Sequence, residues 1–246
     1  MRHSLAQFRQ QLLAKIEEIG LSEYYARPFV CTGSPLACQI MTVGFNPSRN
    51  VGLDIFDHEI WQDDIGFDRE RFVEYYDLAG YQQGESKWSR NHIVQQNLID
   101  ELVEYPVLET YLYSTISHKK SQLTHEFRRT EVFDWLVQTI APKVIITQNS
   151  EVTKYFEKAT NECLTRNAFN TVHYQGHPCV IYPISHLSKK WTFSEIQALR
   201  EHIIELLDLL NGLEPTEQAK DRKSVNSTLE VVEQTMRQEM SLALAS

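Results

Sequence analysis

Two residues in the chain combine suitable chemistry with a suitable sequence context for catalysis, Asn46 and His186. Asn46 lies in residues 44–48, Gly-Phe-Asn-Pro-Ser, directly after the apolar run 39–43. This pattern predicts a buried strand that ends in a tight turn. Glycine lets the backbone approach a ligand closely, and proline fixes the turn and cannot extend the strand pairing. Since ligands bind at the carboxyl ends of strands in open α/β sheets, Asn46 is expected to face one.

Polar residues also gather at the ends of two later runs that predict strands, 107–117 and 179–183. The first group comprises Ser114, Thr115, His118, Lys119 and Lys120, and the second comprises Ser185, His186, Ser188, Lys189 and Lys190. A single pair of lysines is more often a solvated loop. Two pairs at one edge of a sheet, near aromatic residues, are typical of phosphate-backbone contacts combined with base stacking.

Apolar periodicity predicts the elements that carry these groups. The expected helices are 4–19, 68–78, 89–103, 126–140, 150–159 and 192–210, with caps at Ser4, Thr124, Ser150 and in the Thr192–Glu195 capping box. The expected strands are 39–43, 107–117, 143–147, 170–174 and 179–183. Their alternation predicts an α/β fold, a three-layer α/β/α domain over residues 1–213 with a mostly parallel central sheet. Residues 214–246 are polar and are expected to form an appended helix or a mobile tail.

The segment between residues 49 and 105 has little strand character and is rich in aromatic residues. They are Phe56, Trp61, Phe67, Tyr75, Tyr76, Tyr81 and Trp88. A packed subsidiary cluster is one interpretation, and stacking of a flat ligand by one or two of these rings is the other.

Composition sets the class of protein. The 246 residues carry a net charge of −9, which argues against nonspecific coating of nucleic acid but allows a local basic surface. The sequence has no membrane-spanning run and no signal-peptide core, so a cytoplasmic protein without membrane contact is expected. The four cysteines lack the two-residue spacing of a metal clip, which predicts reduced thiols and no metal or cofactor. An iron–sulfur cluster remains the alternative, because four thiolates are the required number.

The motifs resemble those of the uracil-DNA glycosylase superfamily. Gly44-Phe45-Asn46-Pro47-Ser48 is similar to its first motif, in the form with Asn of the mismatch-specific uracil/thymine branch. Ile184-Ser185-His186-Leu187-Ser188 is similar to its second motif, where a His precedes a DNA-penetrating loop. Residues 111–115 and 142–146 match the strand that reads the base edge and the strand after it. The order of elements agrees over residues 39–205, whereas identity is confined to the motifs.

This resemblance implies a uracil-DNA glycosylase-like fold and a monofunctional DNA glycosylase that flips a base and excises it hydrolytically. Asn46 would hold the attacking water through its amide oxygen, and His186 would stabilise the charge of the departing base. The implied base-binding residues are Gly44, Phe45, Tyr113 and Ser114. The implied DNA contacts are Ser48, Lys119, Lys120, Ser185, Leu187, Ser188, Lys189 and Lys190. The expected partner is double- or single-stranded DNA that contains a modified base.

Ser114 departs from the family pattern, because uracil-reading members commonly carry Asn at this place. Some prokaryotic members that resemble this pattern act in antiviral defence and remove glucosylated hydroxymethylcytosine from phage DNA. We therefore rank a hypermodified cytosine first among the expected substrates, followed by uracil or thymine mispaired with guanine.

Two other function classes stay open. The fold would also suit a DNA- or protein-binding module without catalysis, which an Asn46→Ala comparison on base-modified DNA distinguishes. An enzyme acting on free nucleotides or nucleosides is the third class, favoured if the mouth of the site is too narrow for a strand.

Overall fold

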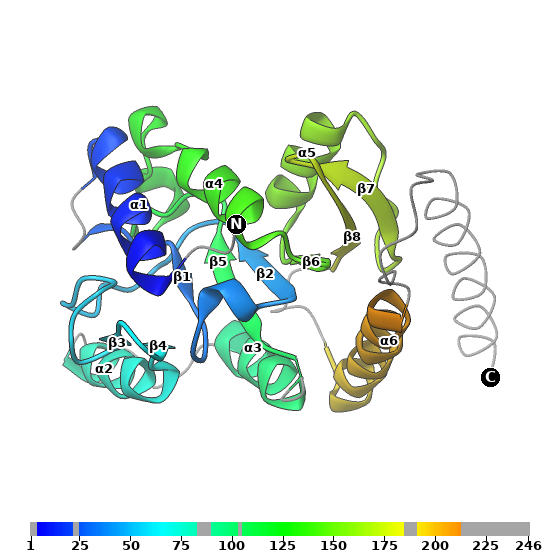
Figure 1. The fold of residues 1–246 in the computed structure, drawn as a ribbon, viewed down its shortest axis with the longest axis horizontal. Coiled ribbons are helices and arrows are strands. Elements are labelled where there is room, and N and C mark those ends of the chain that lie inside the picture. The colour runs from blue at the N-terminus through cyan, green and yellow to red at the C-terminus, as the bar shows by residue number, and fades with distance from the viewer. Residues whose placement is uncertain (1–3, 22–24, 83–89, 103–104, 185–190, 213–246) are drawn as a thin grey trace.

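The computed structural model describes residues 4–21, 25–82, 90–102, 105–184 and 191–212. Within these ranges the chain forms a six-stranded sheet in the order β1-β5-β2-β6-β8-β7 (Figure 1). The strands are β1 (Phe29–Val30), β2 (Ile40–Gly44), β5 (Val107–Tyr111), β6 (Val144–Thr147), β7 (Asn170–Tyr174) and β8 (His177–Pro183). The four central strands β5, β2, β6 and β8 pair in parallel, and the edge strands β1 and β7 run antiparallel to their neighbours.

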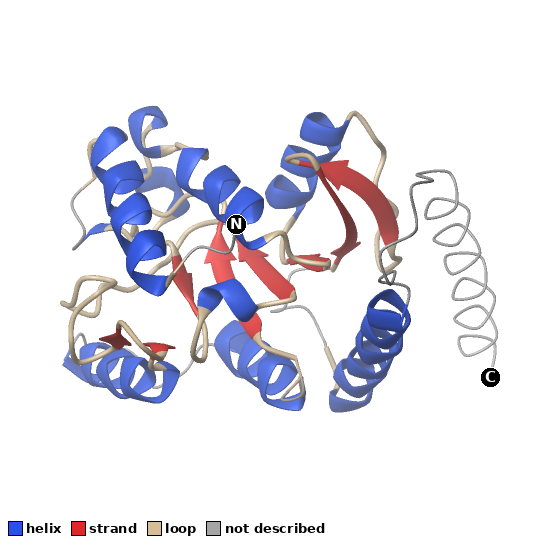
Figure 2. Cartoon of the chain, viewed as in Figure 1, coloured by secondary structure: helices blue, strands red, loops and turns tan. Residues whose placement is uncertain are grey.

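Helices cover both faces of this sheet (Figure 2). They are α1 (Leu5–Glu18), α2 (Arg69–Gln82), α3 (Arg90–Glu101), α4 (Glu131–Ile140), α5 (Ser150–Thr160) and α6 (Phe193–Gly212). In Figure 1, α1, α4 and α5 lie on one side of the sheet and α3 and α6 on the other. The arrangement confirms a mixed α/β architecture with a mostly parallel central sheet, and it is consistent with three layers.

Each central strand contributes alternate residues to two separate apolar cores, because successive side chains of a strand point to opposite faces. Met41 of β2 and Ile145 of β6 pack with α1, α4 and α5. Ile40 and Val144 pack with α3 and α6. Both faces of β2 and β6 are therefore buried, which explains why their sequences are mostly apolar runs rather than alternating ones.

Two expected helix starts are confirmed by their capping contacts. The Ser4 hydroxyl accepts a hydrogen bond from Gln7 N at 3.2 Å, and the Gln7 side chain accepts one from Ser4 N at 3.0 Å. At α6, Glu195 Oε2 accepts a bond from Thr192 N at 2.7 Å, and Thr192 Oγ1 accepts one from Glu195 N at 3.2 Å. Both are reciprocal capping boxes.

The helix predicted over 126–140 is wrong in its first turn. Residues 120–127 form two short 3₁₀ turns, η3 (Lys120–Gln122) and η4 (His125–Phe127), and α4 begins at Glu131. Thr115 Oγ1 donates to Phe127 O at 3.3 Å and Arg128 Nε donates to Leu123 O at 3.1 Å. In η4, Phe127 N and Arg128 N donate to Thr124 O and His125 O, three residues back rather than four, so Thr124 caps no α-helix.

The strand predicted over 107–117 ends at Tyr111. Its partner β2 stops at Gly44, and Pro47 has no N–H with which to continue the ladder. The cap of α5 is Asn149 rather than Ser150, since Asn149 Oδ1 accepts bonds from Glu151 N and Val152 N at 3.0 Å each. β8 begins at His177, two residues before its predicted start.

Three short strands were not predicted from the sequence. They are β1, β3 (Trp61–Gln62) and β4 (Gly66–Phe67), the last two forming a small hairpin. Each has two residues, too few for a period-2 pattern to stand out. Among the described residues no helix has the length and apolarity needed to cross a membrane. Residues 214–246 lie outside the described ranges, so the structure does not test the prediction for this segment.

Candidate functional site

The carboxyl ends of the parallel strands meet at one edge of the sheet. Asn46 follows β2, residues 112–120 follow the neighbouring strand β5, and Gln148 follows β6. The structure thus brings together the first two of the three predicted polar groups. Ser185, His186, Leu187, Ser188, Lys189 and Lys190, which follow β8, lie outside the described residues, and their place in the site stays a prediction.

The side-chain amide of Asn46 is held from one side. Its nitrogen donates to Pro47 O at 2.9 Å and to Ser117 O at 3.0 Å. Both partners are carbonyl oxygens, which accept and cannot donate, so the group that faces them must be the NH₂. This arrangement uses both amide hydrogens and leaves Oδ1 as an acceptor without a partner among the described residues. Asn46 is half-buried, so that oxygen belongs to a surface that solvent can reach.

Backbone hydrogen bonds hold the turn around Asn46 against the chain that follows β5. Leu112 N donates to Gly44 O at 2.9 Å, Tyr113 N to Phe45 O at 3.0 Å and Ser117 N to Pro47 O at 2.9 Å. Three contacts of this kind, on both sides of Asn46, leave the turn little freedom to rotate. Asn46 is therefore oriented by backbone that is itself fixed, which is what a positioning role requires.

An aromatic pair flanks this turn. The rings of Phe45 and Tyr113 meet edge to face with centroids 5.0 Å apart, and Lys120 Nζ lies 4.6 Å from the centroid of Phe45. The Lys120 ammonium also forms an ion pair with Glu151 in the first turn of α5. Partial desolvation, followed by repulsion from Arg128, lowers the pKa of Lys120. Lys119 and Lys120 are both exposed, but Lys120 is held against Phe45 and Glu151.

Ser114 lies deeper than a base-contacting residue is expected to lie. It is 2% exposed, and its hydroxyl is buried without a hydrogen-bond partner in the described part of the chain. Its carbonyl accepts a bond from Arg27 N at 2.8 Å. Ser48, by contrast, is exposed on the surface side of the turn.

A buried ionic network lies beneath Gly44. A Cβ added at Gly44 would approach the Tyr111 ring to 2.9 Å, so glycine is needed for this contact. Tyr111 donates its hydroxyl hydrogen to Glu109 Oε1 at 2.7 Å and accepts from Arg27 Nη2 at 3.3 Å. Glu109 also lies 3.6 Å from Arg69 Nη2, and both side chains are more than nine-tenths buried.

Arg27 connects this network to the turn. Its Nη1 donates to Arg49 O at 3.0 Å, and its guanidinium lies 5.4–5.5 Å from the ring centroids of Phe72, Tyr76 and Tyr111. Burial acts to lower the pKa of Arg27, but the neighbouring Tyr111, Tyr76 and Glu109 outweigh it and the pKa is raised. A permanent cation therefore sits under the segment that follows Asn46.

The aromatic segment is mostly core. Phe56, Trp61 and Phe67 surround Phe29 with ring centroids 5.6–6.4 Å away, and all are at most 4% exposed. Tyr76 is also buried and carries the Arg49 guanidinium 4.3 Å from its centroid. For these rings the packed-cluster interpretation is confirmed. Trp88 lies outside the described residues.

Sequence reasoning missed three residues of this edge: Arg27, Gln148 and Glu151. Arg27 lies outside every helix and strand that the sequence predicts, and nothing in its local pattern indicates burial. Gln148 directly follows the apolar run 144–147, so the rule that pointed to Asn46 would also have found it. A Cβ at Gly44 would lie 3.8 Å from Gln148 Oε1, which places that amide beside the Asn46 turn.

The described residues contain no group of three or more His, Cys, Asp or Glu side chains able to hold a metal ion. All four cysteines are within the described ranges, and Cys163 is exposed while the other three are buried. The iron–sulfur alternative therefore gains no support from their arrangement.

In comparisons with known proteins, no protein-family model and no curated protein matches the chain.

Proposed function

We propose that this chain is a monofunctional DNA glycosylase with a uracil-DNA glycosylase-like fold. The observation that carries the proposal is the Asn46 amide, fixed at the carboxyl end of β2 by two carbonyl oxygens so that Oδ1 remains to accept. The resemblance of residues 44–48 and 184–188 to the two family motifs supports the same assignment. So does the order of parallel strands, because β2 and β8, the strands that precede the two motifs in the sequence, end at the same edge of the sheet.

The proposed reaction is hydrolysis of the bond between C1′ of the sugar and the base nitrogen. A water held by Asn46 Oδ1 attacks C1′ as the bond to the base breaks, and the electron pair leaves with the base. One water proton stays on the new C1′ hydroxyl, and the other ends on the released base. His186 donates a hydrogen bond to the departing base and stabilises its charge. No lysine nucleophile takes part, so the product is an intact strand with an abasic site.

We further propose a bulky modified cytosine, such as a glucosylated hydroxymethylcytosine of phage DNA, as the favoured substrate. Uracil recognition needs a donor and an acceptor held against one base edge, and the Ser114 hydroxyl supplies no such pair. Selectivity then comes from shape or from groups attached to the base. Uracil and mispaired thymine follow as weaker substrates.

The proposal is tested by excision from duplexes that are identical except for one base, with abasic sites revealed by alkali. Asn46→Ala is expected to lower the excision rate at least about 10²-fold, a barrier increase of roughly 3 kcal/mol. Asn50→Ala, in the same loop, is the matched control, because Asn50 only closes a local turn by accepting from Gly52 N at 2.9 Å. An unchanged thermal midpoint would show that Asn46→Ala still folds.

The outcomes separate the alternatives. Equal excision by Asn46→Ala and the parent would refute the hydrolytic role. Faster release of uracil than of the modified cytosine would reverse the substrate order and keep the activity. Binding of modified DNA without excision by the parent would favour the inactive binding module, and hydrolysis of free nucleosides alone would favour the third class.

A further inference from the structure

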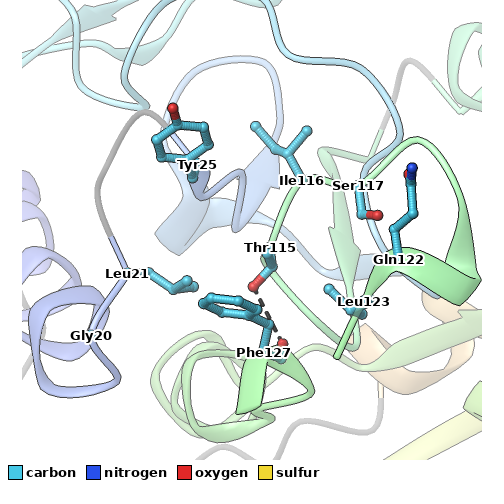
Figure 3. Close-up of a pocket in the computed structure, with 9 residues that line it drawn as sticks. All are labelled: Gly20, Leu21, Tyr25, Thr115, Ile116, Ser117, Gln122, Leu123 and Phe127. Atoms are coloured by element: carbon cyan, nitrogen blue, oxygen red, sulfur yellow. Dashed lines mark hydrogen bonds between the residues drawn. The ribbon is translucent and has the colours of Figure 1, made fainter. Parts of the chain in front are cut away.

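A pocket of about 460 Å³ opens beside the Asn46 turn (Figure 3). Its lining includes Tyr25, Thr115, Ser117, Gln122, Leu123 and Phe127. Ser117 belongs to both places, since its carbonyl accepts the Asn46 amide and its N–H donates to Pro47 O. In Figure 3 the Phe127 ring lies between Leu21 and Leu123, and Ser117 and Gln122 lie on the side away from Leu21.

The rings of this pocket are unusually open to solvent. Tyr25 is 61% exposed and Phe127 is 41% exposed, whereas Leu123 beneath them is buried. Thr115 Oγ1 donates to Phe127 O, which ties the Phe127 segment to the chain after β5. Two exposed rings over an apolar floor offer stacking faces to a flat group.

The segment that forms one wall is basic in an otherwise acidic protein. Residues 118–129 contain Lys119, Lys120, Arg128 and Arg129 against the single carboxylate of Glu126, while the whole chain has a net charge of −9. Lys120 is paired with Glu151, and Arg129 is paired with Glu131. Lys119 has no ion pair with any described residue, and Arg128 uses only its Nε, in a bond to Leu123 O. These two cations can meet phosphates without first losing an internal carboxylate.

Two polar side chains at the rim of the pocket, Gln122 and Ser117, have free hydrogen-bonding capacity. The side-chain oxygen Oε1 of Gln122 accepts a hydrogen bond from Lys119 N at 3.2 Å, which leaves the side-chain NH₂ as a donor. The Ser117 hydroxyl donates to Lys119 O at 2.9 Å and can still accept. Rings and hydrogen-bonding groups in the pocket, with cations on the segment that forms one of its walls, match a nucleotide better than an apolar protein side chain.

We propose that this pocket binds a nucleobase next to the nucleotide presented to Asn46, stacked on Tyr25 and Phe127. The phosphates of that strand lie along residues 118–129, with Lys119 and Arg128 as their contacts. The proposal rests on the proposed function for the identity of the strand. It adds a second base site, about one nucleotide away from the reacting one, that would grip the strand during base flipping.

The test measures binding of a fluorescein-labelled single-stranded 11-mer by anisotropy, with Tyr25→Ala, Tyr25→Phe and Phe127→Ala. Loss of one base–ring stack corresponds to at least about fivefold weaker binding, so both alanine variants should show this loss. Tyr25→Phe keeps the ring and should bind within about twofold of the parent. Ile65→Ala, at a 58% exposed apolar residue in the turn joining β3 and β4, is the matched control and should bind like the parent.

A second readout uses 2-aminopurine placed directly beside an abasic analogue. Stacking should quench its fluorescence with the parent and with Tyr25→Phe, but not with Tyr25→Ala. Parent-like binding and quenching by Tyr25→Ala would overturn the inference, and because Tyr25 is exposed that variant should fold normally.

Excision assays on the same variants keep the two proposals apart. If the parent excises bases and Tyr25→Ala binds unchanged, the pocket proposal fails alone. If the parent binds DNA in a Tyr25-dependent way but excises nothing, the glycosylase proposal fails alone. No DNA binding by the parent would overturn both.

Discussion

Replacing Arg27 would test whether the buried network is held by charge or by geometry. The guanidinium is 5% exposed, makes two hydrogen bonds and contacts three rings. Arg27→Met keeps most of the stem and removes both the bonds and the buried charge. Hydrogen bonds to a charged group contribute about 1.5–3 kcal/mol each, but removing the ion also relieves its desolvation. We therefore expect Met to lower the free energy of unfolding by about 2–3 kcal/mol.

Arg27→Lys should be more damaging than Arg27→Met. An ammonium is compact and strongly hydrated, so it cannot span both Arg49 O and the Tyr111 hydroxyl from this position. The variant would keep a buried charge while losing one or both of its bonds, a combination that costs about 3–5 kcal/mol. Because Arg27 holds the carbonyl of Arg49 after the Asn46 turn, excision should also fall about tenfold in both variants.

The measurement is urea unfolding followed by circular dichroism, with Arg71→Met as the control. Arg71 is a half-exposed arginine that pairs with Glu74 at 2.7 Å, and its loss should change stability by no more than about 0.5 kcal/mol. A Lys variant as stable as the parent, or more stable than the Met variant, would refute the geometric explanation. Charge alone would then account for the role of Arg27.

Two further predictions use other parts of the structure. Lys119→Gln should reduce the slope of log K against log salt for DNA binding by about one unit, whereas Lys120→Gln should reduce it less, because Glu151 already neutralises Lys120; equal changes in the two slopes would contradict the internal pairing. Burial raises the pKa of Tyr182 to about 12, so its contribution to stability is complete below pH 10 and is lost as the pH rises towards 12. Tyr182→Phe cannot ionise, and in urea unfolding at pH 9 and pH 11.5 it should lose about 2 kcal/mol less than the parent between the two values.

The central strands β2 and β6 were predictable because they are mostly apolar runs. β2, β6 and β7 lie within one residue of their predicted bounds, and the parallel arrangement followed from the alternation with helices. The contacts that decide the remaining boundaries are long-range. Phe127 O, for example, accepts from Thr115 Oγ1, and the local pattern around residue 126, which predicts a helix, contains no information about that contact.

The candidate site also contains residues that the sequence predicts and residues that it does not. Asn46 was found from its own neighbours, since a strand, a glycine and a proline determine where it points. Arg27 was not, because its burial depends on rings and a carboxylate from two other segments, α2 and β5. Ser114 was assigned from its place in a motif, and its burial beneath the Arg27 backbone could not be deduced from that place.

The order of the strands places Gln148 between the ends of β2 and β8, because Gln148 follows β6. β6 lies between β2 and β8, and neighbouring strands are about 4.8 Å apart, so the ends of β2 and β8 are about 10 Å from each other. That separation suits a sugar and its base, with Gln148 on the floor between them.

The Gln148 amide makes no hydrogen bond with the described residues, so it can turn to offer its donor and acceptor in either order. Such a group pairs with the edge of cytosine or of uracil, which supports selection by attached groups rather than by that edge. Gln148→Ala should therefore slow excision of both bases by a similar factor, about tenfold, for the one or two hydrogen bonds lost. If the protein held the amide in one orientation, Gln148→Ala would instead slow the excision of one base far more than that of the other. A rate loss confined to uracil or to the modified cytosine would thus show that Gln148 discriminates between them.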